Sequence, residues 1–158
     1  EVCVSGNGVE LKKKFDIGRV FLEIKEGKIR VFSEKATRRE SKMVGTIWAH
    51  LKNMIKGVNE EFVYELEVCN VHFPMTVKAE DGRVSIKSFL GEKKERYASI
   101  LPNVNIEVKG SNIIVRSHDI EAAGQTAANL EKATRLSGRD RRIFQDGIFI
   151  TSKPGRKI

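Results

Sequence analysis

Two stretches of this chain repeat one another. Residues 20–33 read VFLEIKEGKIRVFS and residues 104–117 read VNIEVKGSNIIVRS; they align without a gap, with six identities in fourteen positions. In both, apolar side chains alternate with polar ones around a polar or glycine-containing turn, which predicts a β-hairpin with one buried face. A duplication of this kind fixes the organisation of a chain before propensities are considered, so we expect two copies of one small folding unit.

A helix is predicted after each hairpin. Thr37 and Glu40 have the spacing of a capping box, and Gly57 suits the position just after a helix end. The second helix is expected to begin near Asp119 and to end at Gly138. In both segments, apolar residues recur at intervals of three and four, which places them on one buried face.

The remaining periodic segments are predicted to be strands. They cover residues 9–15, 62–69, 75–79, 83–89 and 147–151. The fold class is therefore α+β, with one domain over residues 1–70, a second over 71–153 and a short basic extension over 154–158.

The formal charge of +8 is unevenly distributed along the chain. Residues 1–70 carry 13 basic and 11 acidic side chains, and residues 71–158 carry 16 and 10. Residues 132–158 alone carry 8 basic and 2 acidic side chains. Clustered Lys and Arg side chains displace condensed counterions from phosphates, so this excess favours a nucleic acid partner over a merely solvated charged surface.

No group of side chains has the spacing of a catalytic or metal site. His50, His72 and His118 do not have metal-ligand spacing, and we expect structural roles for them. Asp140 and Asp146 could form an acid/base or metal-binding pair. Asp146 begins a turn, however, and Asp140 lies among arginines, so structural roles are predicted here too. We therefore expect no catalytic residue, no metal and no cofactor.

Cysteine usage and hydropathy indicate a cytosolic protein. Cys3 and Cys69 lack the paired spacing of a zinc or redox site and are predicted to be two buried thiols without a disulfide. No apolar run approaches the roughly 20 residues of a membrane span, and the first residues do not have the pattern of a secretory signal.

The C-terminal stretch is predicted to be a folded anchor with charged flanks. Residues 138–142 form a charged loop, residues 143–151 a strand-like element pinned to the core, and residues 153–158 an extension that orders on RNA. Charges held on a rigid scaffold recognise folded RNA through its backbone and shape. The predicted RNA-binding side chains of this stretch are Arg139, Arg141, Arg142, Lys153, Arg156 and Lys157.

Five motifs, in order along the chain, carry a family resemblance. They are KNMIKGV (52–58), HFPMTV (72–77), FLGEKK (89–94), GQTAAN (124–129) and RIFQDGIFITSK (142–153). With these motifs the chain resembles the large-subunit ribosomal protein L6 family in its archaeal and eukaryotic form, and GQTAAN looks more archaeal. The resemblance implies a tandem α+β duplication, in which each copy has two small, mainly antiparallel sheets and one helix around a single core.

The resemblance also implies a place and partners. Family members bind large-subunit ribosomal RNA near the sarcin–ricin loop, close to the stalk base and its proteins, where translational GTPases dock. They support assembly of the cytoplasmic ribosome and are not enzymes. Carried onto this chain, the resemblance adds Gln125 and Asn129 to the RNA-facing residues, with Lys132 and Arg135 just beyond them. It also implies that the first domain meets neighbouring large-subunit proteins, for which Trp48 is a candidate if it is not in the core.

Two other functions remain open at this point: a small basic RNA-processing enzyme, and a protein-interaction module whose charge is incidental. The first would require turnover of RNA that depends on Asp140 or Asp146. The second would require binding that is insensitive to salt.

Overall fold

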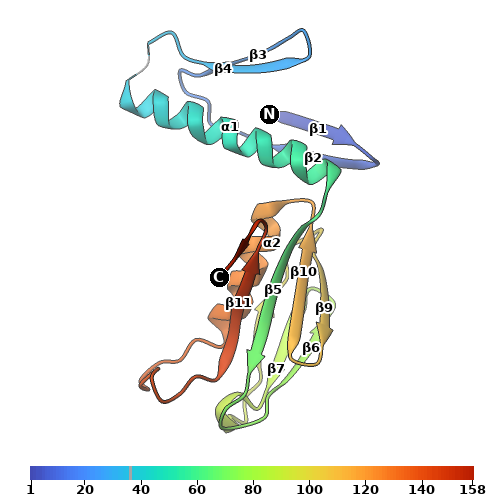
Figure 1. The fold of residues 1–158 in the computed structure, drawn as a ribbon, viewed down its shortest axis with the longest axis vertical. Coiled ribbons are helices and arrows are strands. Elements are labelled where there is room, and N and C mark those ends of the chain that lie inside the picture. Colours follow the sequence, from blue (N-terminus) through green and yellow to red (C-terminus); the bar gives the residue numbers. More distant parts are fainter. Residues whose placement is uncertain (36) are drawn as a thin grey trace. The chain divides into compact units, whose positions relative to one another are not determined.

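The structure is a computed structural model that describes residues 1–35 and 37–158. It divides the chain into two compact units, Glu1–Glu60 and Glu61–Ile158 (Figure 1). Each unit contains antiparallel strands and one long helix, with a separate hydrophobic core. This confirms the predicted α+β fold class and the tandem arrangement.

The first unit consists of two hairpins and a helix. Its elements are β1 (Val2–Gly6), β2 (Val9–Lys13), β3 (Phe21–Lys25), β4 (Lys28–Phe32) and α1 (Arg38–Asn59). Within the described residues, β1 pairs with β2 and β3 with β4, which gives two separate two-stranded sheets. Helix α1 packs against both hairpins, and Val20, Ile47 and Leu51 are buried where they meet.

The start of α1 is as predicted, but its end is not. Thr37 and Glu40 form the capping box. Gly57, the expected residue after the helix, is instead buried inside it, and the backbone N–H of Glu60 closes the last turn on Lys56 at 2.9 Å. The next residue, Val58, packs so closely on β1 that a Cβ built on Gly6 would lie 2.8 Å from it. Tertiary packing therefore extends the helix past its local stop signal.

The second unit has a larger sheet, a smaller sheet and one helix. The strands are β5 (Phe62–Cys69), β6 (Thr76–Glu80), β7 (Arg83–Lys87), β8 (Arg96–Ser99), β9 (Asn105–Lys109), β10 (Asn112–Ser117), β11 (Gly147–Lys153) and β12 (Arg156–Lys157); the helices are the short 3-10 helix η1 (Phe89–Gly91) and α2 (Ile120–Ala133). The strand orders are β12-β11-β5-β10-β9 and β6-β7-β8, with every pairing antiparallel. Strand β8 had no counterpart in the sequence prediction.

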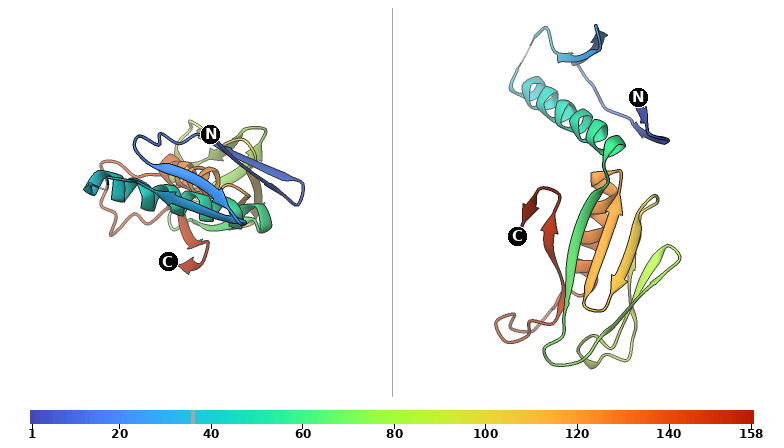
Figure 2. Two further views of the ribbon diagram at one scale, coloured as in Figure 1. Left: turned by 90° about the horizontal axis from the view of Figure 1, so that it is seen from above. Right: turned by 45° about the vertical axis from the view of Figure 1, so that its right-hand side comes forward.

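The domain boundary lies at residue 60, whereas the sequence predicted residue 70. Strand β5 occupies the centre of the five-stranded sheet, between β10 and β11 (Figures 1 and 2). Leu66 of β5 is opposite Ile113 on one side and Ile150 on the other. The strand follows α1 directly in the sequence, and only its pairing partners, which come more than forty residues later, assign it to the second unit.

Helix α2 is shorter than predicted. It ends at Ala133, with Thr134 as its C-cap, and Gly138 lies in the loop beyond, at a φ of 70°. The carbonyl oxygen of Ala133 accepts a hydrogen bond of 2.9 Å from the Arg96 guanidinium of β8. The Arg96 side chain therefore satisfies a carbonyl oxygen at the end of α2, where the sequence of the helix itself offers no stop signal.

The last residues form a strand pair instead of the predicted free extension. Lys153 and Arg156 face each other across the turn between β11 and β12, and Gly155 in that turn has a φ of 78°. This is the left-handed conformation that glycine adopts without strain. The basic C-terminus is therefore folded onto the edge of the five-stranded sheet.

The prediction of two buried thiols was wrong. Cys3 is exposed on β1 and its thiol donates to a Glu10 carboxylate oxygen at 3.0 Å, while Cys69 at the end of β5 is only half-buried. Both are at strand positions that face away from the cores of their units.

Gly45 and Gly124 occupy the same position in the two copies of the repeat, but substitution by alanine is expected to affect stability differently at the two sites. The repeat places Gly45 of α1 on Gly124 of α2. A Cβ at Gly45 would meet nothing within 4 Å, so Gly45→Ala should stabilise the first unit by up to about 1 kcal/mol through helix propensity. A Cβ at Gly124 would lie 2.9 Å from the Tyr64 hydroxyl, so overpacking of roughly 1–3 kcal/mol should cancel or exceed that gain.

Urea unfolding of the two variants, followed separately for each unit, tests this pair. Equal stabilisation by both substitutions would mean that α2 does not press on Tyr64 of β5 as the structure has it.

Candidate nucleic-acid interface

Half of the ten predicted RNA-binding residues lie where α2 ends and in the loop that follows it. Lys132 and Arg135 lie in and just after the last turn of α2, and Arg139, Arg141 and Arg142 lie in the loop that leads to β11. All five are exposed. Lys153, Arg156 and Lys157 form a second basic group on the β11–β12 hairpin and are exposed as well.

Net charge differs more between two parts of the second unit than between the first and the second unit. Residues 1–60 carry 13 basic and 8 acidic side chains, net +5, and residues 61–158 carry 16 and 13, net +3. The first unit therefore has the larger net charge when the chain is divided at residue 60, whereas division at the predicted residue 70 gave net +2 and net +6. Residues 61–131 carry 8 basic and 11 acidic side chains, net −3, whereas residues 132–158 are net +6. The basic end of the chain, residues 132–158, therefore carries the excess in two groups: one at the end of α2 and in the following loop, the other on the β11–β12 hairpin at the far end of β11.

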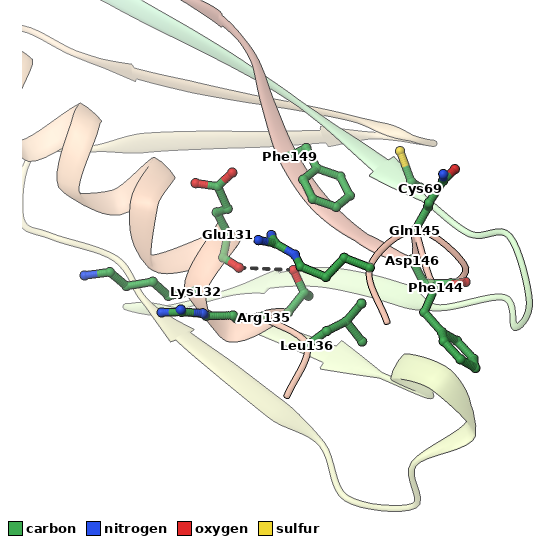
Figure 3. A pocket seen from close by; sticks show the side chains of 11 residues that line it. Cys69, Glu131, Lys132, Arg135, Leu136, Phe144, Gln145, Asp146 and Phe149 are labelled. Atoms are coloured by element: carbon green, nitrogen blue, oxygen red, sulfur yellow. Dashed lines mark hydrogen bonds between the residues drawn. The ribbon is translucent and has the colours of Figure 1, made fainter. Parts of the chain in front are cut away.

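A cavity of about 690 Å³ lies at this basic end (Figure 3). Its lining comes from the end of α2, the following loop, the end of β5 and the start of β11: Cys69, Glu131, Lys132, Thr134, Arg135, Leu136, Arg141, Phe144, Gln145, Asp146 and Phe149. Figure 3 shows Lys132 and Arg135 at one end of the cavity and Phe144 and Gln145 at the other. Three predicted RNA-binding residues, Lys132, Arg135 and Arg141, thus share one hollow with aromatic side chains.

The buried carboxylate of Asp146 holds this loop to the chain segment after β5. It is 1% exposed and accepts hydrogen bonds from the backbone N–H groups of Val71 and His72, at 2.8 and 2.9 Å. The His72 Nδ1 lies 2.6 Å from its other oxygen. Burial by itself raises the pKa of Asp146, but the hydrogen bonds from His72 and Val71 outweigh it and hold the pKa below the usual value of an aspartate. The structural role predicted for Asp146 is confirmed.

Asp146 also positions one arginine indirectly. The His72 ring packs on Phe144, with centroids 4.9 Å apart, and the Arg139 guanidinium carbon lies 4.7 Å from the Phe144 ring centroid. A guanidinium over an aromatic face is attracted by the ring electrons. The side chains of Asp146, His72, Phe144 and Arg139 therefore form a continuous stack, which we call the anchor stack, and it gives Arg139 a defined position.

Arg142 has a different environment. Its guanidinium contacts both carboxylate oxygens of Asp140, at 3.2 and 3.0 Å, and its backbone N–H donates to the same carboxylate. These hydrogen bonds from Arg142, first the side chain and then the backbone, lower the pKa of Asp140. Since Asp140 partly neutralises Arg142, we expect Arg142 to contribute less to anion binding than Arg139 or Arg141.

Gln125 and Asn129 lie apart from the cavity lining. Gln125 donates to the Asn129 side-chain oxygen at 2.9 Å, and the Asn129 amide donates to both the carbonyl and the hydroxyl oxygen of Ser99 at 3.1 Å. Asn129 thereby ties α2 to β8. Their contact with RNA stays a prediction, to which the structure adds this packing role.

Sequence reasoning missed several residues of the cavity. Phe149 was assigned only to an alternating strand, and Glu131 and Gln145 were not singled out at all. Gln145 and Phe149 could have been identified from the motif RIFQDGIFITSK, in which Gln145 precedes Asp146 directly and Phe149 follows it by three residues. Glu131 has no such signal, because only the end of α2 brings it to the cavity.

Comparison with known proteins gives the family. The sequence model of ribosomal protein L6 matches residues 73–147. A protein named large ribosomal subunit protein uL6 from Archaeoglobus fulgidus is 47% identical over 135 residues, which are 85% of this chain and 69% of the relative. The chain belongs to the ribosomal protein L6 family. Proteins of the same name from Methanothrix thermoacetophila and Methanococcus vannielii are 46% and 42% identical, cover 97% and 100% of the chain, and are themselves covered to 91% and 87%.

The family assignment confirms the resemblance seen in the five motifs. The part matched by the L6 sequence model includes the loop arginines and three members of the anchor stack, Arg139, Phe144 and Asp146; His72 lies one residue before its start. The matched range therefore includes the loop that carries Arg139, and it ends at the first residue of β11, before the basic residues of the β11–β12 hairpin.

Two features of the described residues bear on other classes of function. Among residues 1–35 and 37–158, no group of three or more His, Cys, Asp or Glu side chains could hold a metal ion. None of the helices in this part of the chain is both long and apolar enough to cross a membrane.

Proposed function

We propose that this chain is a structural constituent of the large ribosomal subunit that binds large-subunit ribosomal RNA through the basic end of its second unit. The observation that carries the proposal is the concentration of net +6 in residues 132–158 of an L6 family member. Five basic and two acidic side chains of this stretch belong to residues 132–146, the end of α2 and the loop that Asp146 fixes to the core. Fixed cations match the spacing of backbone phosphates without first losing side-chain and loop entropy.

The finer placement follows from the family resemblance. We propose binding near the sarcin–ricin loop and the stalk base, where the protein would support subunit assembly and the docking region of translational GTPases. The place of action is then the ribosome in the cytoplasm. The role is structural and not enzymatic.

A salt titration tests the RNA proposal. With about five phosphates neutralised, the slope of log K against log salt should be roughly −3 to −5 for a large-subunit RNA fragment that contains the sarcin–ricin loop. The control is an RNA duplex of equal length without that loop, which should bind more weakly at every salt concentration. An affinity that does not change with salt would refute the proposed RNA binding. Equal affinity for the two RNAs would refute the proposed binding near the sarcin–ricin loop.

A second proposal concerns the first unit, which we infer to contact a neighbouring ribosomal protein. Five of its large apolar side chains are 40–79% exposed: Phe21, Ile24, Ile29, Trp48 and Ile55. A groove of about 400 Å³ between the β3–β4 hairpin and α1 is lined mainly by apolar residues, among them Trp48 and Ile55. Exposed apolar patches of this kind mark protein interaction sites. Lys52, whose ammonium lies 5.2 Å from the Trp48 ring centroid, favours a partner with acidic side chains at the rim.

Trp48 is the one tryptophan of the sequence, so it can report on this contact. With 7-azatryptophan at this position, excited selectively, emission should shift to shorter wavelength when the protein is bound in large subunits, because the ring loses water. Naked ribosomal RNA should leave the emission unchanged. Emission that stays at the wavelength of the free protein in intact subunits would rule out a partner on this groove.

A further inference from the structure

The cavity at the basic end contains more than cations. Beside Lys132, Arg135 and Arg141, its lining includes Phe144 and Phe149. The Phe144 ring already packs on His72 and Arg139, which leaves Phe149 as the aromatic wall. Its volume of about 690 Å³ is within the roughly 300–1,000 Å³ range of small-molecule sites. A phosphate group alone would need neither an aromatic wall nor this volume. We propose that the cavity receives the base of one unstacked nucleotide of the RNA, an inference that rests on the proposed RNA binding and adds a specific ligand to it.

The wall formed by Phe149 is held in place by the backbone. A Cβ built on Gly147 would lie 3.1 Å from the Phe149 ring, so the ring lies against the glycine with no room for a side chain between them. The next backbone N–H, of Ile148, donates to the Thr134 hydroxyl at 2.9 Å and ties the start of β11 to the end of α2. The Phe149 side chain is therefore already in this position in the protein without a ligand.

The chemistry of the lining fits an unstacked base better than a base in a duplex. Bases in an A-form helix are stacked and lie behind the backbone, whereas bases in loops and bulges can turn out and stack on aromatic side chains. Lys132, Arg135 and Arg141 are then placed to pair with the phosphates on either side of the extruded nucleotide.

Two polar side chains of the lining give the site a preference. The Glu131 carboxylate accepts hydrogen bonds only, while the Gln145 amide can donate and accept. A base with an exocyclic amino group can donate to Glu131, as cytosine does to carboxylates through N4. Uracil lacks an amino group, so the cavity is expected to bind cytosine, adenine or guanine better than uracil.

Nucleotide titration of the full chain tests the site directly. In ¹⁵N-labelled protein, CMP, AMP and GMP should shift the amide signals of Gln145, Ile148 and Phe149 more than UMP does. Inorganic phosphate in a parallel titration should shift the basic residues of the lining but leave Phe149 in place. Shifts from phosphate that equal those from the nucleotides would overturn the proposal in favour of a simple anion site, and the absence of shifts from any nucleotide would overturn it as well.

Ribosomal RNA binding provides the second measurement. Phe149→Leu keeps an apolar side chain but removes the stacking face, and it should weaken binding of the large-subunit RNA fragment roughly 5- to 150-fold. Since no charge is lost, the slope of log K against log salt should not change. Phe149→Tyr should restore the affinity. The matched control is Phe21→Leu, at a 50% exposed phenylalanine of the first unit, which should have no effect.

The two proposals fail in different ways. Unchanged RNA affinity in Phe149→Leu, with a steep salt slope retained, would refute the nucleotide site and leave RNA binding intact. A wild-type protein that does not bind the RNA fragment would refute the proposed function, and the nucleotide titration would still decide whether the cavity takes a base.

Discussion

Replacing Arg139, Arg141 and Arg142 together with alanine is expected to weaken binding of the large-subunit RNA fragment about 100-fold at 0.1 M salt. Each phosphate contact contributes about 0.7–0.9 to the slope of log K against log salt, so losing up to three contacts should reduce the slope by roughly 2. Arg142 should contribute least, because Asp140 partly neutralises it. Filter binding across a salt series measures both quantities.

The control for this variant removes the same charge from the first unit. Lys25, Lys28 and Arg30 lie on the β3–β4 hairpin, are exposed, and can be replaced by alanine together. If RNA recognition resides in the second unit, this variant should keep most of the affinity. Equal losses in the two triple variants would mean that only total charge matters and that the loop holds no specific position on the RNA.

Asp146→Asn is expected to destabilise the second unit by about 2–4 kcal/mol at pH 7. The carboxylate is 1% exposed and accepts three hydrogen bonds, two of them from backbone N–H groups. Hydrogen bonds to a charged acceptor are stronger than neutral ones, and an amide has only one oxygen, so its NH2 group would face His72 Nδ1 and require the ring to change tautomer. Urea unfolding at neutral pH measures the loss.

The effect of Asp146→Asn should depend on pH in a defined direction. The folded pKa of Asp146 is lowered, so its contribution to stability is fully present above the unfolded value of about 3.9 and is lost as the pH falls through the lower folded pKa. The difference in unfolding free energy between wild type and variant should therefore be constant near neutrality and shrink below about pH 4.

A matched control separates this network from general charge effects. Asp81 is exposed in the turn between β6 and β7, and Asp81→Asn should change stability by less than about 0.5 kcal/mol. A wild-type-to-variant difference for Asp146 that persists unchanged at pH 3 would show that the carboxylate charge does not hold the loop, and the anchor stack would lose its basis.

Local signals in the sequence predicted the parts of the fold that depend on local physics. The capping box at Thr37 and Glu40 is satisfied within one turn of helix, so it is readable without tertiary information. The same holds for the hairpins, because alternation and turn residues lie next to each other in the chain. Helix ends behaved differently: Gly57 was overridden by packing on β1, and α2 ends where Arg96 of β8 reaches its last carbonyl.

The candidate site was predictable in part. The loop arginines were found from charge density, which is a property of the sequence alone. Their surroundings were not, because the anchor stack joins His72 to residues more than sixty positions later, and nothing in either segment specifies that contact. Phe149 illustrates the same limit, since alternation assigns it to a strand but does not reveal that its ring faces a cavity.

The sequence by itself determined the duplication, the α+β class, the membership of the L6 family and the basic character of the last residues. These features follow from hydrophobic periodicity, sequence identity and charge, which can be read without knowing which distant segments of the chain are in contact. The tertiary structure alone decided that β5 belongs to the second unit, that the basic end has a cavity with an aromatic wall, and that a buried carboxylate fixes the arginine loop. Each of these rests on contacts between segments far apart in the chain, and their free energy arises only when those segments meet.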